Sequence, residues 1–324
     1  MSELHQALQE TAQTEQVEIK DLPYFNYRFK DVKDISVLSQ LKKVKYLDLI
    51  GAKIIDISPL KELVDIEFLT LTYSKIKDVG PLQNLHKLEQ LDLGDNQIKD
   101  ISVLGKLPAL KRLDLSCNPL KDTSSLHGMT NLEGLDIGGI PEIKDFSFLS
   151  KLTKLKTLSL YDNELEDVSF LKPLAQLNWL CLNCNQISDI SSLAHLQNLD
   201  FLWSNDNPVL DYAPLQELSN LTKLTLEENK ITDISFLQKM TKLESLYLED
   251  NEIEDISVLQ YLTQLKTLWL SNNKIIDFGP LLKLSQLQTI RIDGNLVTEE
   301  DKVVKQLRAQ GVKVILEGRS CSIK

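Results

Sequence analysis

LEQLDLGDNQIKDISVLGKL, the stretch Leu88–Leu107, gives the pattern that the chain repeats over most of its length. Its positions read L-x-x-L-x-L-x-x-N-x-I-x-D-I-x-x-L-x-x-L. The pair at Leu91 and Leu93 occurs twelve times with small changes, and the first members of successive pairs lie 22 residues apart. One step, from Leu135 to Leu158, is 23 residues. A fixed period in the twenties is typical of a solenoid, in which each repeat buries its apolar face against its neighbours.

Each repeat contains the parts of one solenoid coil. The Leu-x-Leu pair predicts a short parallel strand whose leucines both point inward, because alternate side chains of a strand face opposite ways. An Asn such as Asn96 follows five residues after the first Leu, and its amide can satisfy the backbone N–H and C=O groups that stacked turns hide from water. The Asp four residues later, as at Asp100 and Asp233, suits the N-cap of a short helical turn.

The repeat pattern resembles the leucine-rich repeats of bacterial internalins, down to strings such as LESLYLEDNEIEDI at Leu243–Ile256. The resemblance covers Phe25 to Val297, and the repeats are more loosely similar to those of the phosphatase-regulatory subunit SDS22. It implies an α/β solenoid: a leucine-rich-repeat horseshoe with one long parallel β-sheet on the concave face and short helical turns on the convex side. Such repeats host many partners, so the resemblance identifies no particular one.

The two ends of the chain depart from the repeat. We expect residues 1–24 to form an N-terminal cap, with a polar helix around Glu3–Thr14 and then a short extended run at Val17–Ile19. The array of about 13 coils is expected over residues 25–297. Residues 298–324 are expected to form a C-terminal cap, a helix plus a final strand, and a tail. Thr298-Glu-Glu-Asp301 resembles a capping box at the start of that helix.

Composition and charge exclude several classes of protein. The 324 residues are 42% hydrophobic, enough for a continuous core, and no apolar stretch approaches the length of a membrane span. The net charge of −11 argues against a nucleic-acid surface, because phosphate contacts need clustered Lys and Arg. We therefore expect a protein partner, with no nucleic acid and no membrane, and a monomeric chain.

The expected compartment follows from the N-terminus and the cysteines. The first twenty residues are polar and acidic, where a secretory signal needs a basic start and an apolar run. The four cysteines fall in no paired framework, which favours a reducing environment. We predict a cytoplasmic protein. The alternative is secretion or translocation without a cleaved signal peptide.

No arrangement of residues predicts catalysis. The four histidines fall in the cap or on the far side of the coils, so no His pairs with a nucleophile on the open face. Cys181 and Cys184 lie along one strand, about 10 Å apart at about 3.3 Å per residue, too far for a disulfide. Cys321-Ser-Ile-Lys324 has the shape of a prenylation box but ends in Lys, a poor last residue. We predict no enzymatic activity, no cofactor and no metal site.

Aromatic residues gather on the face of the predicted sheet that points away from the core. Counted from the first Leu of each pair, positions −1, +1 and +3 project from this open face, and position +4 lies at its rim. All three tryptophans fall there. Strands favour aromatic residues in any case, but exposed aromatic patches usually mark binding sites. The aromatic residues predicted to bind a partner are Tyr161, Trp179, Phe201, Trp203, Tyr247 and Trp269.

The same positions hold twelve acidic and only three basic residues. Asp92, Asp114 and Asp136 stack in one column, where like charges oppose folding. A basic partner would relieve this repulsion and be steered in by it, although surface acids can also serve solubility alone. A metal site is disfavoured because a single file of aspartates offers oxygens along a line and not around a cage. The acidic residues predicted to bind a partner are Glu227, Glu228, Glu249 and Asp250.

These observations predict a non-enzymatic protein-binding scaffold that engages a basic epitope through its acidic and aromatic concave face, as an adaptor or an internalin-like effector. The alternative is a regulatory subunit that docks on an enzyme such as a phosphatase. Two coils break the consensus: one contains Gly138-Gly-Ile-Pro-Glu142, and the other has Ser204 at a core Leu position. A buried polar group costs stability unless it is bonded, so a local distortion is expected at Ser204, either reshaping the binding face or neutral.

Overall fold

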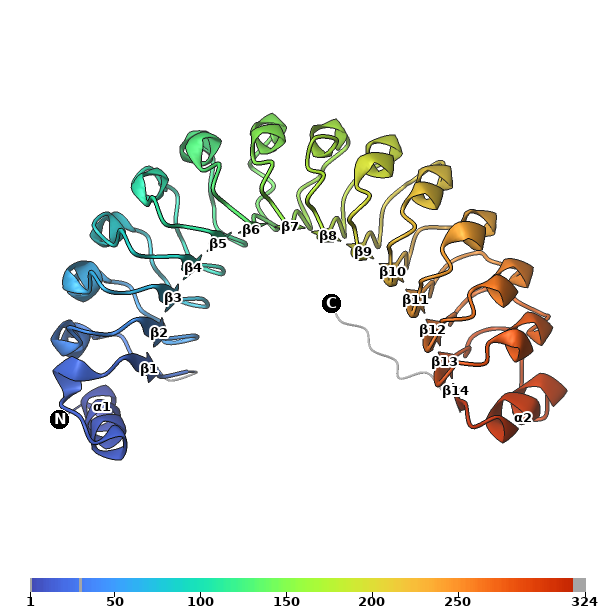
Figure 1. Ribbon diagram of the computed structural model, residues 1–324, viewed down its shortest axis with the longest axis horizontal. Helices are drawn as coiled ribbons and strands as arrows, with labels where there is room; N and C mark the ends of the chain where they lie inside the picture. Colours follow the sequence, from blue (N-terminus) through green and yellow to red (C-terminus); the bar gives the residue numbers. More distant parts are fainter. Residues whose placement is uncertain (1, 29–30, 317–324) are drawn as a thin grey trace. The chain divides into compact units, whose positions relative to one another are not determined.

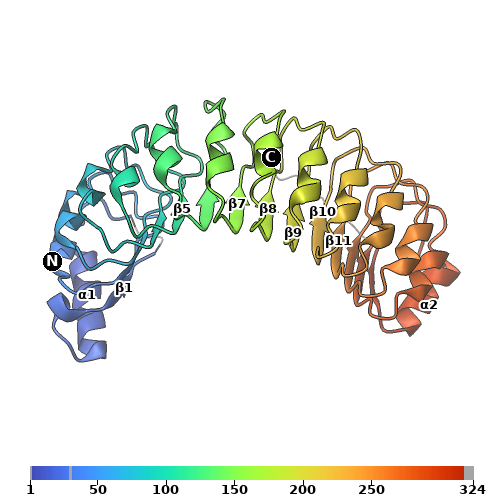
Figure 2. The same ribbon diagram turned by 45° about the horizontal axis from the view of Figure 1, so that its top comes forward.

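The computed structural model describes residues 2–28 and 31–316, so the motif at Cys321–Lys324 lies outside the described residues. The chain groups into two compact units, Met1–Asn163 and Glu164–Lys324, here called the N-terminal and C-terminal units. Within each unit, parallel strands follow one another in chain order on one side, and short helices lie on the other (Figures 1 and 2). The predicted fold class, a leucine-rich-repeat solenoid, is confirmed.

The strands are three residues long, and their register follows the sequence period. In the N-terminal unit Leu47 pairs with Leu69 across the usual step, and Leu135 pairs with Leu158 across the longer one. The strands of this unit are β1 (Tyr24–Asn26), β2 (Tyr46–Asp48), β3 (Phe68–Thr70), β4 (Gln90–Asp92), β5 (Arg112–Asp114), β6 (Gly134–Asp136) and β7 (Thr157–Ser159). Those of the C-terminal unit are β8 (Trp179–Cys181), β9 (Phe201–Trp203), β10 (Lys223–Thr225), β11 (Ser245–Tyr247), β12 (Thr267–Trp269), β13 (Thr289–Arg291) and β14 (Lys313–Ile315).

The short helices opposite the strands are 3₁₀ turns. In the N-terminal unit they are η1 (Ile19–Asp21), η2 (Ser36–Gln40), η3 (Ser58–Glu62), η4 (Gly80–Leu82), η5 (Leu104–Lys106), η6 (Ser124–Gly128) and η7 (Ser147–Lys151). In the C-terminal unit they are η8 (Ser169–Leu171), η9 (Ser191–His195), η10 (Ala213–Glu217), η11 (Ser235–Lys239), η12 (Ser257–Tyr261) and η13 (Gly279–Lys283). Among the described residues, no helix has both the length and the apolar character to cross a membrane.

Two α-helices lie near the ends of the chain. Helix α1 (Glu3–Glu15) covers the predicted helix, but η1 takes part of the place of the predicted extended run. Helix α2 (Lys302–Ala309) lies within the predicted C-terminal cap and begins later than Thr298. The side chain of Asp301 accepts bonds from the N–H and the hydroxyl of Thr298, at 2.5 and 2.9 Å. The Asp301 N–H, however, donates to the Thr298 carbonyl, and the N-cap of α2 is Asp301, so the expected capping box that starts the helix at Thr298 is wrong. The cap boundaries at residues 24 and 298 stay predictions.

The Asn that nine of the twelve repeats contain joins neighbouring coils, as predicted. Asn96 Oδ1 accepts from the Ile76 N–H at 3.0 Å, and its Nδ2 donates to the carbonyls of Leu71 and Leu93 at 3.0 and 2.9 Å. One buried side chain therefore satisfies both kinds of backbone group in two successive coils. Leu91 and Leu93 are themselves fully buried, so the predicted inward direction is confirmed.

The Asp of each repeat acts one position earlier than predicted. Asp233 Oδ1 accepts from the Ser235 N–H at 2.8 Å, and that Ser is the first residue of η11. The N-cap position itself holds Ile234, which makes no side-chain capping bond. The Asp therefore satisfies the first turn from just outside the helix, through the same kind of bond that an N-cap makes.

A residue in the left-handed backbone region lies at position +4 of all twelve repeats, directly before the position that holds Asn in nine of them. Gly51, Gly139 and Gly294 serve in three of them. The other nine are Tyr73, Asp95, Cys117, Asp162, Cys184, Asp206, Glu228, Asp250 and Asn272, with φ between 51° and 57°. This turn carries the chain from the strand into the core side of the coil and presents the +4 side chain at the rim.

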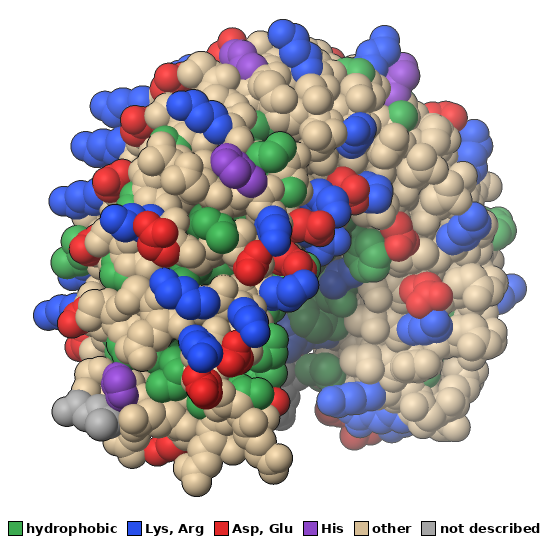
Figure 3. Space-filling view, turned by 60° about the vertical axis from the view of Figure 1, so that its left-hand side comes forward, with side chains coloured by type: hydrophobic (Ala, Val, Ile, Leu, Met, Phe, Trp, Pro, Cys, Tyr) green, Lys and Arg blue, Asp and Glu red, His purple; other side chains and the backbone are tan. Residues whose placement is uncertain are grey.

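Ion pairs link equivalent positions of adjacent coils. Lys45 pairs with Glu67 at 2.7 Å and Lys111 with Glu89 at 2.9 Å, each across one period. Figure 3 shows Lys and Arg side chains next to Asp and Glu side chains over much of the face that it presents. Exposed pairs of this kind contribute little each, so the buried Leu and Asn columns dominate the stability of the stack.

Candidate partner-binding face

Nine of the ten predicted site residues lie on or beside strands of the C-terminal unit. The register places Trp203, Thr225, Tyr247, Trp269 and Arg291 in one column across β9 to β13, as the repeat predicts. Trp179 and Phe201 pair in the neighbouring column, two residues earlier along the strands. The sequence therefore brings these side chains to one face of the sheet.

The rings of this face pack against one another. Trp179 meets Trp203 edge to face, with centroids 5.2 Å apart, and Tyr247 meets Trp269 in the same manner at 4.8 Å. We call these four residues the aromatic cluster. All four are half-buried, and the indole N–H groups of Trp203 and Trp269 are buried with no partner among the described residues.

Two cations of this chain lie over the rings of the aromatic cluster. Lys223 Nζ is 5.4 Å from the ring centroid of Trp203 and 5.3 Å from that of Tyr247. The guanidinium carbon of Arg291 lies 4.8 Å from the ring of Trp269. Both are within cation–π range. The chain therefore already fills part of the place that a partner's Arg or Lys would take.

The four predicted acids, here called the acidic block, have few cations to balance them. Glu249 lies 3.5 Å from Arg291, and Glu227 accepts a hydrogen bond from Asn205 at 2.9 Å. Burial, and then the neighbouring carboxylates of Glu249, Asp250 and Glu228, raise the pKa of Glu227 to about 7. Burial also raises the pKa of Glu249. The block is thus a partly desolvated group of carboxylates that an added positive charge would stabilise.

Tyr161, the tenth predicted residue, makes its contacts inside the N-terminal unit. Its hydroxyl lies 3.2 Å from Cys117 Sγ, and its ring lies over Gly138, where a Cβ would come within 2.2 Å of it. Burial, and then the bond with Cys117, raise its pKa well above its ordinary value. Tyr161 therefore covers the irregular coil that carries Gly138, and that Gly is needed for the ring to lie there.

The aspartates of the N-terminal column accept hydrogen bonds, and two of their carboxyl groups have raised pKa values. Asp92 accepts from the Thr70 hydroxyl at 3.2 Å, and Asp136 from the Gly138 N–H at 3.0 Å. Burial, and then the charge of Asp114, raise the pKa of Asp136 to about 6, and burial raises the pKa of Asp92. Within residues 2–28 and 31–316, no group of three or more His, Cys, Asp and Glu could hold a metal.

Sequence reasoning missed three aromatic residues of the N-terminal unit. Tyr24, Tyr46 and Phe68 pair in register on β1 to β3 and are 43%, 40% and 36% exposed. We call them the aromatic column. Their position, −1 before the first apolar residue of each strand, was the signal that could have identified them.

Comparison with known proteins supports the repeat architecture. A family model described as leucine-rich repeats in two copies matches residues 65–106, 108–151, 130–173, 219–261 and 263–302. Among solved structures, an internalin from Listeria monocytogenes, InlF, is 32% identical with a TM-score of 0.83, and the match covers 98% of this chain and 95% of that one. A search of curated proteins found no match.

Two further structures share the fold at lower identity. A leucine-rich-repeat protein from Leptospira interrogans is 21% identical with a TM-score of 0.74, over 91% of this chain and 84% of that one. The ectodomain of the receptor kinase GASSHO1/SCHENGEN3 from Arabidopsis thaliana is 22% identical with a TM-score of 0.67, over 88% of this chain and 37% of that one. It was solved in complex with CASPARIAN STRIP INTEGRITY FACTOR 2.

Proposed function

Because this chain belongs to the leucine-rich-repeat family and is of the internalin type, we propose that it is a protein-binding scaffold with no enzymatic activity of its own. The proposed compartment is the cytoplasm, with secretion or translocation without a cleaved signal peptide as the alternative. The proposed layout keeps an N-terminal cap over residues 1–24, the array over 25–297 and a C-terminal cap beyond. The scaffold is proposed to act as a monomer.

The proposed binding surface is the aromatic cluster with the acidic block beside it, together with Phe201. Its partner is a protein with a basic epitope next to an apolar anchor. One observation carries this proposal: Glu227 lies partly desolvated among three other carboxylates, and its pKa is raised to about 7. An Arg or Lys of a partner would stabilise the ionised carboxylate. Lys223 and Arg291 already lie over the rings, so that Arg or Lys is expected to pair with the acids.

The first experiment identifies the partner by affinity capture on the purified full chain, followed by mass spectrometry. Binding of the purified partner is then measured by calorimetry for the double variant Glu227→Gln, Glu228→Gln. The matched control is Glu62→Gln, Glu217→Gln, which removes the same charge from exposed ends of η3 and η10. We expect the first variant to bind about tenfold more weakly and the control to bind as the native chain does.

Stopped-flow association rates test the role of charge directly. The rate is expected to fall as salt rises from about 0.05 to 0.5 M, because screening removes long-range steering over that range. A rate independent of salt, together with native affinity in the acidic-block variant, would reject the basic epitope. If the captured partner is an enzyme whose activity changes on binding, the regulatory-subunit alternative applies instead.

A further inference from the structure

In the C-terminal unit, the loop that contains Val209 and the loop that contains Lys230 in the next coil lack a backbone hydrogen bond that other coils make. In other coils the residue after the Asn of the repeat donates a hydrogen bond to the preceding coil. The Glu252 N–H donates to the Ile231 carbonyl at 2.8 Å, and the Lys274 N–H donates to the Ile253 carbonyl at 2.9 Å. The equivalent bond, from Lys230 N–H to the Val209 carbonyl, does not occur in the described structure. These two loops have therefore separated at this point.

The Val209 N–H has also lost its usual partner. In neighbouring coils the equivalent N–H donates to an Asn side chain, as Ile231 does to Asn251 at 2.9 Å. Asn251 Oδ1 also accepts from the Asn229 N–H, at 3.1 Å. Asn229 Oδ1 keeps the bond equivalent to this second one, from the Asn207 N–H at 2.9 Å, but no bond from Val209 is made within residues 2–28 and 31–316. Pro208 lies in this loop and has no N–H, and the Leu210 N–H bonds the Ser188 carbonyl at 3.1 Å. Beyond Asn207, the loop is therefore bonded through Leu210 to the coil before it, and among the described residues Val209 makes no bond to the coil after it.

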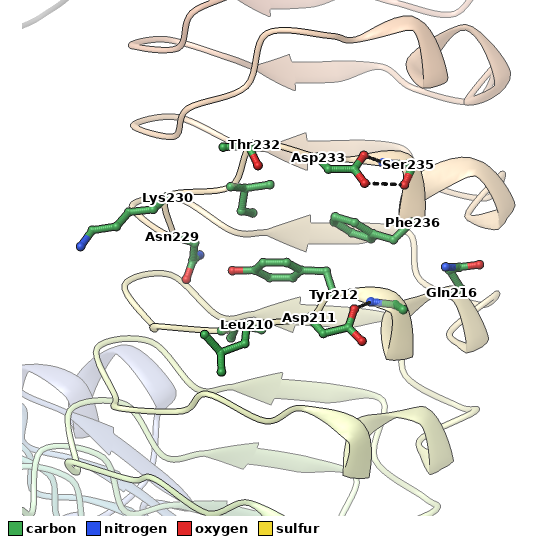
Figure 4. A pocket seen from close by; sticks show the side chains of 13 residues that line it. Leu210, Asp211, Tyr212, Gln216, Asn229, Lys230, Thr232, Asp233, Ser235 and Phe236 are labelled. Atoms are coloured by element: carbon green, nitrogen blue, oxygen red, sulfur yellow. Dashed lines mark hydrogen bonds between the residues drawn. The ribbon is translucent and has the colours of Figure 1, made fainter.

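A cavity of about 290 Å³ lies between the two separated loops (Figure 4). Its apolar wall contains Tyr212 and Phe236, which stack with centroids 5.3 Å apart, and Leu210, which is 86% exposed. Tyr212 takes the place that Ile has in the consensus, and only 9% of it is exposed. In Figure 4 its hydroxyl points away from the 3₁₀ helices toward the loop that carries Asn229. The volume is close to the lower end of the range for ligand pockets, about 300 Å³.

The polar groups of this cavity define the chemistry that fits it. The hydroxyl of Tyr212 is buried with no hydrogen-bond partner among the described residues. Burial raises the pKa of Tyr212, so the phenol stays protonated and can donate. Val209 and Lys230 line the cavity, and their N–H groups and the Val209 carbonyl have no bond among the described residues, which adds two donors and one acceptor. The nearby carboxylate of Asp211 already accepts from the Ala213 N–H at 2.8 Å and disfavours an anion.

We propose that this cavity is a binding site for a neutral amide that carries an apolar group, as in a peptide segment of a partner protein with a Leu-like side chain. An amide offers a C=O to the orphan donors, as the Asn251 side chain does to the Ile231 N–H, and an N–H to the Val209 carbonyl, as the Glu252 backbone does to the Ile231 carbonyl. The apolar group packs on Leu210 and Tyr212. None of the residues that line this cavity belongs to the acidic block. A test of this binding site is therefore independent of the proposal that the partner has a basic epitope.

The test uses the full chain labelled with ¹⁵N and the probe N-acetyl-leucine methylamide, a neutral peptide-bond mimic. Titration is expected to give saturable amide shifts at Val209 and Lys230, with none at Glu252 and Lys274. Tyr212→Phe, which removes only the hydroxyl, is expected to weaken binding about fivefold. Leu210→Ala, at an exposed position that cannot threaten folding, is expected to weaken it as well.

Two controls make the outcome decisive. The anionic probe N-acetyl-leucine is expected to bind more weakly than the methylamide. Hydrogen exchange of the Val209 and Lys230 amides is expected to be faster than that of Glu252 and Lys274, because only the latter are bonded to a neighbouring coil. Equal protection of all four amides, or shifts that spread over the chain without saturating up to the solubility of the probe, would overturn the proposal.

Discussion

Aromatic side chains lie on the open face of the sheet in both units, but in different states. In the aromatic column, Tyr46 and Phe68 touch loosely, with centroids 6.1 Å apart, and both are exposed. In the aromatic cluster, Tyr247 and Trp269 are half-buried and meet edge to face at 4.8 Å, with Arg291 over the indole. The open face of the sheet therefore holds rings that pack against neighbouring side chains, in the aromatic cluster, and rings that stay exposed, in the aromatic column.

The aromatic cluster and the aromatic column differ in burial because different side chains lie next to their rings. Three rings of the cluster, those of Trp203, Tyr247 and Trp269, occupy position +1, and Trp179 occupies position −1. The cations over these rings, Lys223 and Arg291, come from the same face. The column occupies position −1 at the start of the array, where Lys45 is paired with Glu67 instead of a ring. An outward direction is therefore not enough to make a ring available to a partner, because neighbouring side chains decide whether its faces are already covered.

The largest expected effect tests whether the core beneath both groups is equivalent. Leu69→Ala and Leu246→Ala remove fully buried side chains next to Phe68 and Tyr247 on their strands. Each is expected to lower the free energy of unfolding by about 3 kcal/mol, through lost burial and a cavity. Urea unfolding measures both. A large loss in one unit only would mean that the two groups differ because their cores differ.

The next effect separates the two groups directly. Trp269→Ala is expected to lower the free energy of unfolding by about 2 kcal/mol, because it removes a packed ring, an edge-to-face contact and a cation–π contact. Phe68→Ala is expected to cost less than about 0.5 kcal/mol, as for an exposed surface residue. Chemical unfolding of both variants checks this. Equal losses would contradict the distinction between cluster and column.

The acids beside the rings are expected to respond to pH. The folded-state pKa of Glu227 is raised to about 7 from 4.5, so its contribution to stability is fully present below pH 4.5 and is lost as pH rises through 7. Glu227→Gln is therefore expected to match the native chain at low pH and to exceed it by about 1 kcal/mol at about pH 8, allowing for solvent screening.

Unfolding of both chains at the two pH values measures this difference. In the N-terminal unit, the pKa of Asp136 is raised to about 6 from 3.8. The free energy of unfolding of Asp136→Asn should therefore rise above that of the native chain over a lower pH range. A Glu227→Gln curve parallel to the native one would show that the carboxylate is fully solvated.

The smallest effect concerns the cation over the rings. Lys223→Met keeps most of the side-chain stem and removes the charge that lies over Trp203 and Tyr247. It is expected to cost about 0.5 kcal/mol. The matched variant Lys45→Met removes an exposed ion pair with Glu67 and is expected to cost still less. If the two variants unfold alike, the contact of Lys223 with the rings contributes nothing measurable.

The fold was largely predictable from the sequence because apolar periodicity alone decides which side chains face the core. Leu91, Leu93 and Asn96 take the predicted places, and the register follows the repeat through the longer step at Leu135. The helix starts were less predictable. Whether an Asp bonds from the N-cap or from just before it depends on backbone angles that the residue type does not fix.

The positions of the candidate site residues were predictable from the sequence, but the burial and the contacts of their side chains were not. The column of Trp203, Tyr247 and Trp269 was visible from spacing, but the cations over the rings were not, since rotamers and packing decide where Lys223 and Arg291 lie. Ser204 is buried and its hydroxyl has no partner among the described residues, but its N–H makes the regular bond to the Thr225 carbonyl at 3.0 Å, so the backbone is not distorted at Ser204 itself. The separation of the loops at Val209 depends on hydrogen bonds that the residue pattern does not predict. Pro208, which follows the Asn of this repeat and has no N–H, was the one residue that indicated an irregular turn here.

The left-handed turn at the rim has a consequence for protein engineering. Nine of the twelve repeats hold a side chain at a φ that glycine adopts more easily, and each such residue costs about 1 kcal/mol of backbone strain. Glu228 and Asp250 of the acidic block are two of these residues. Replacing them with glycine would remove that strain together with their charge. A library that selects for thermal resistance alone would therefore tend to erase the acidic block, and selections on this scaffold should hold those two positions fixed.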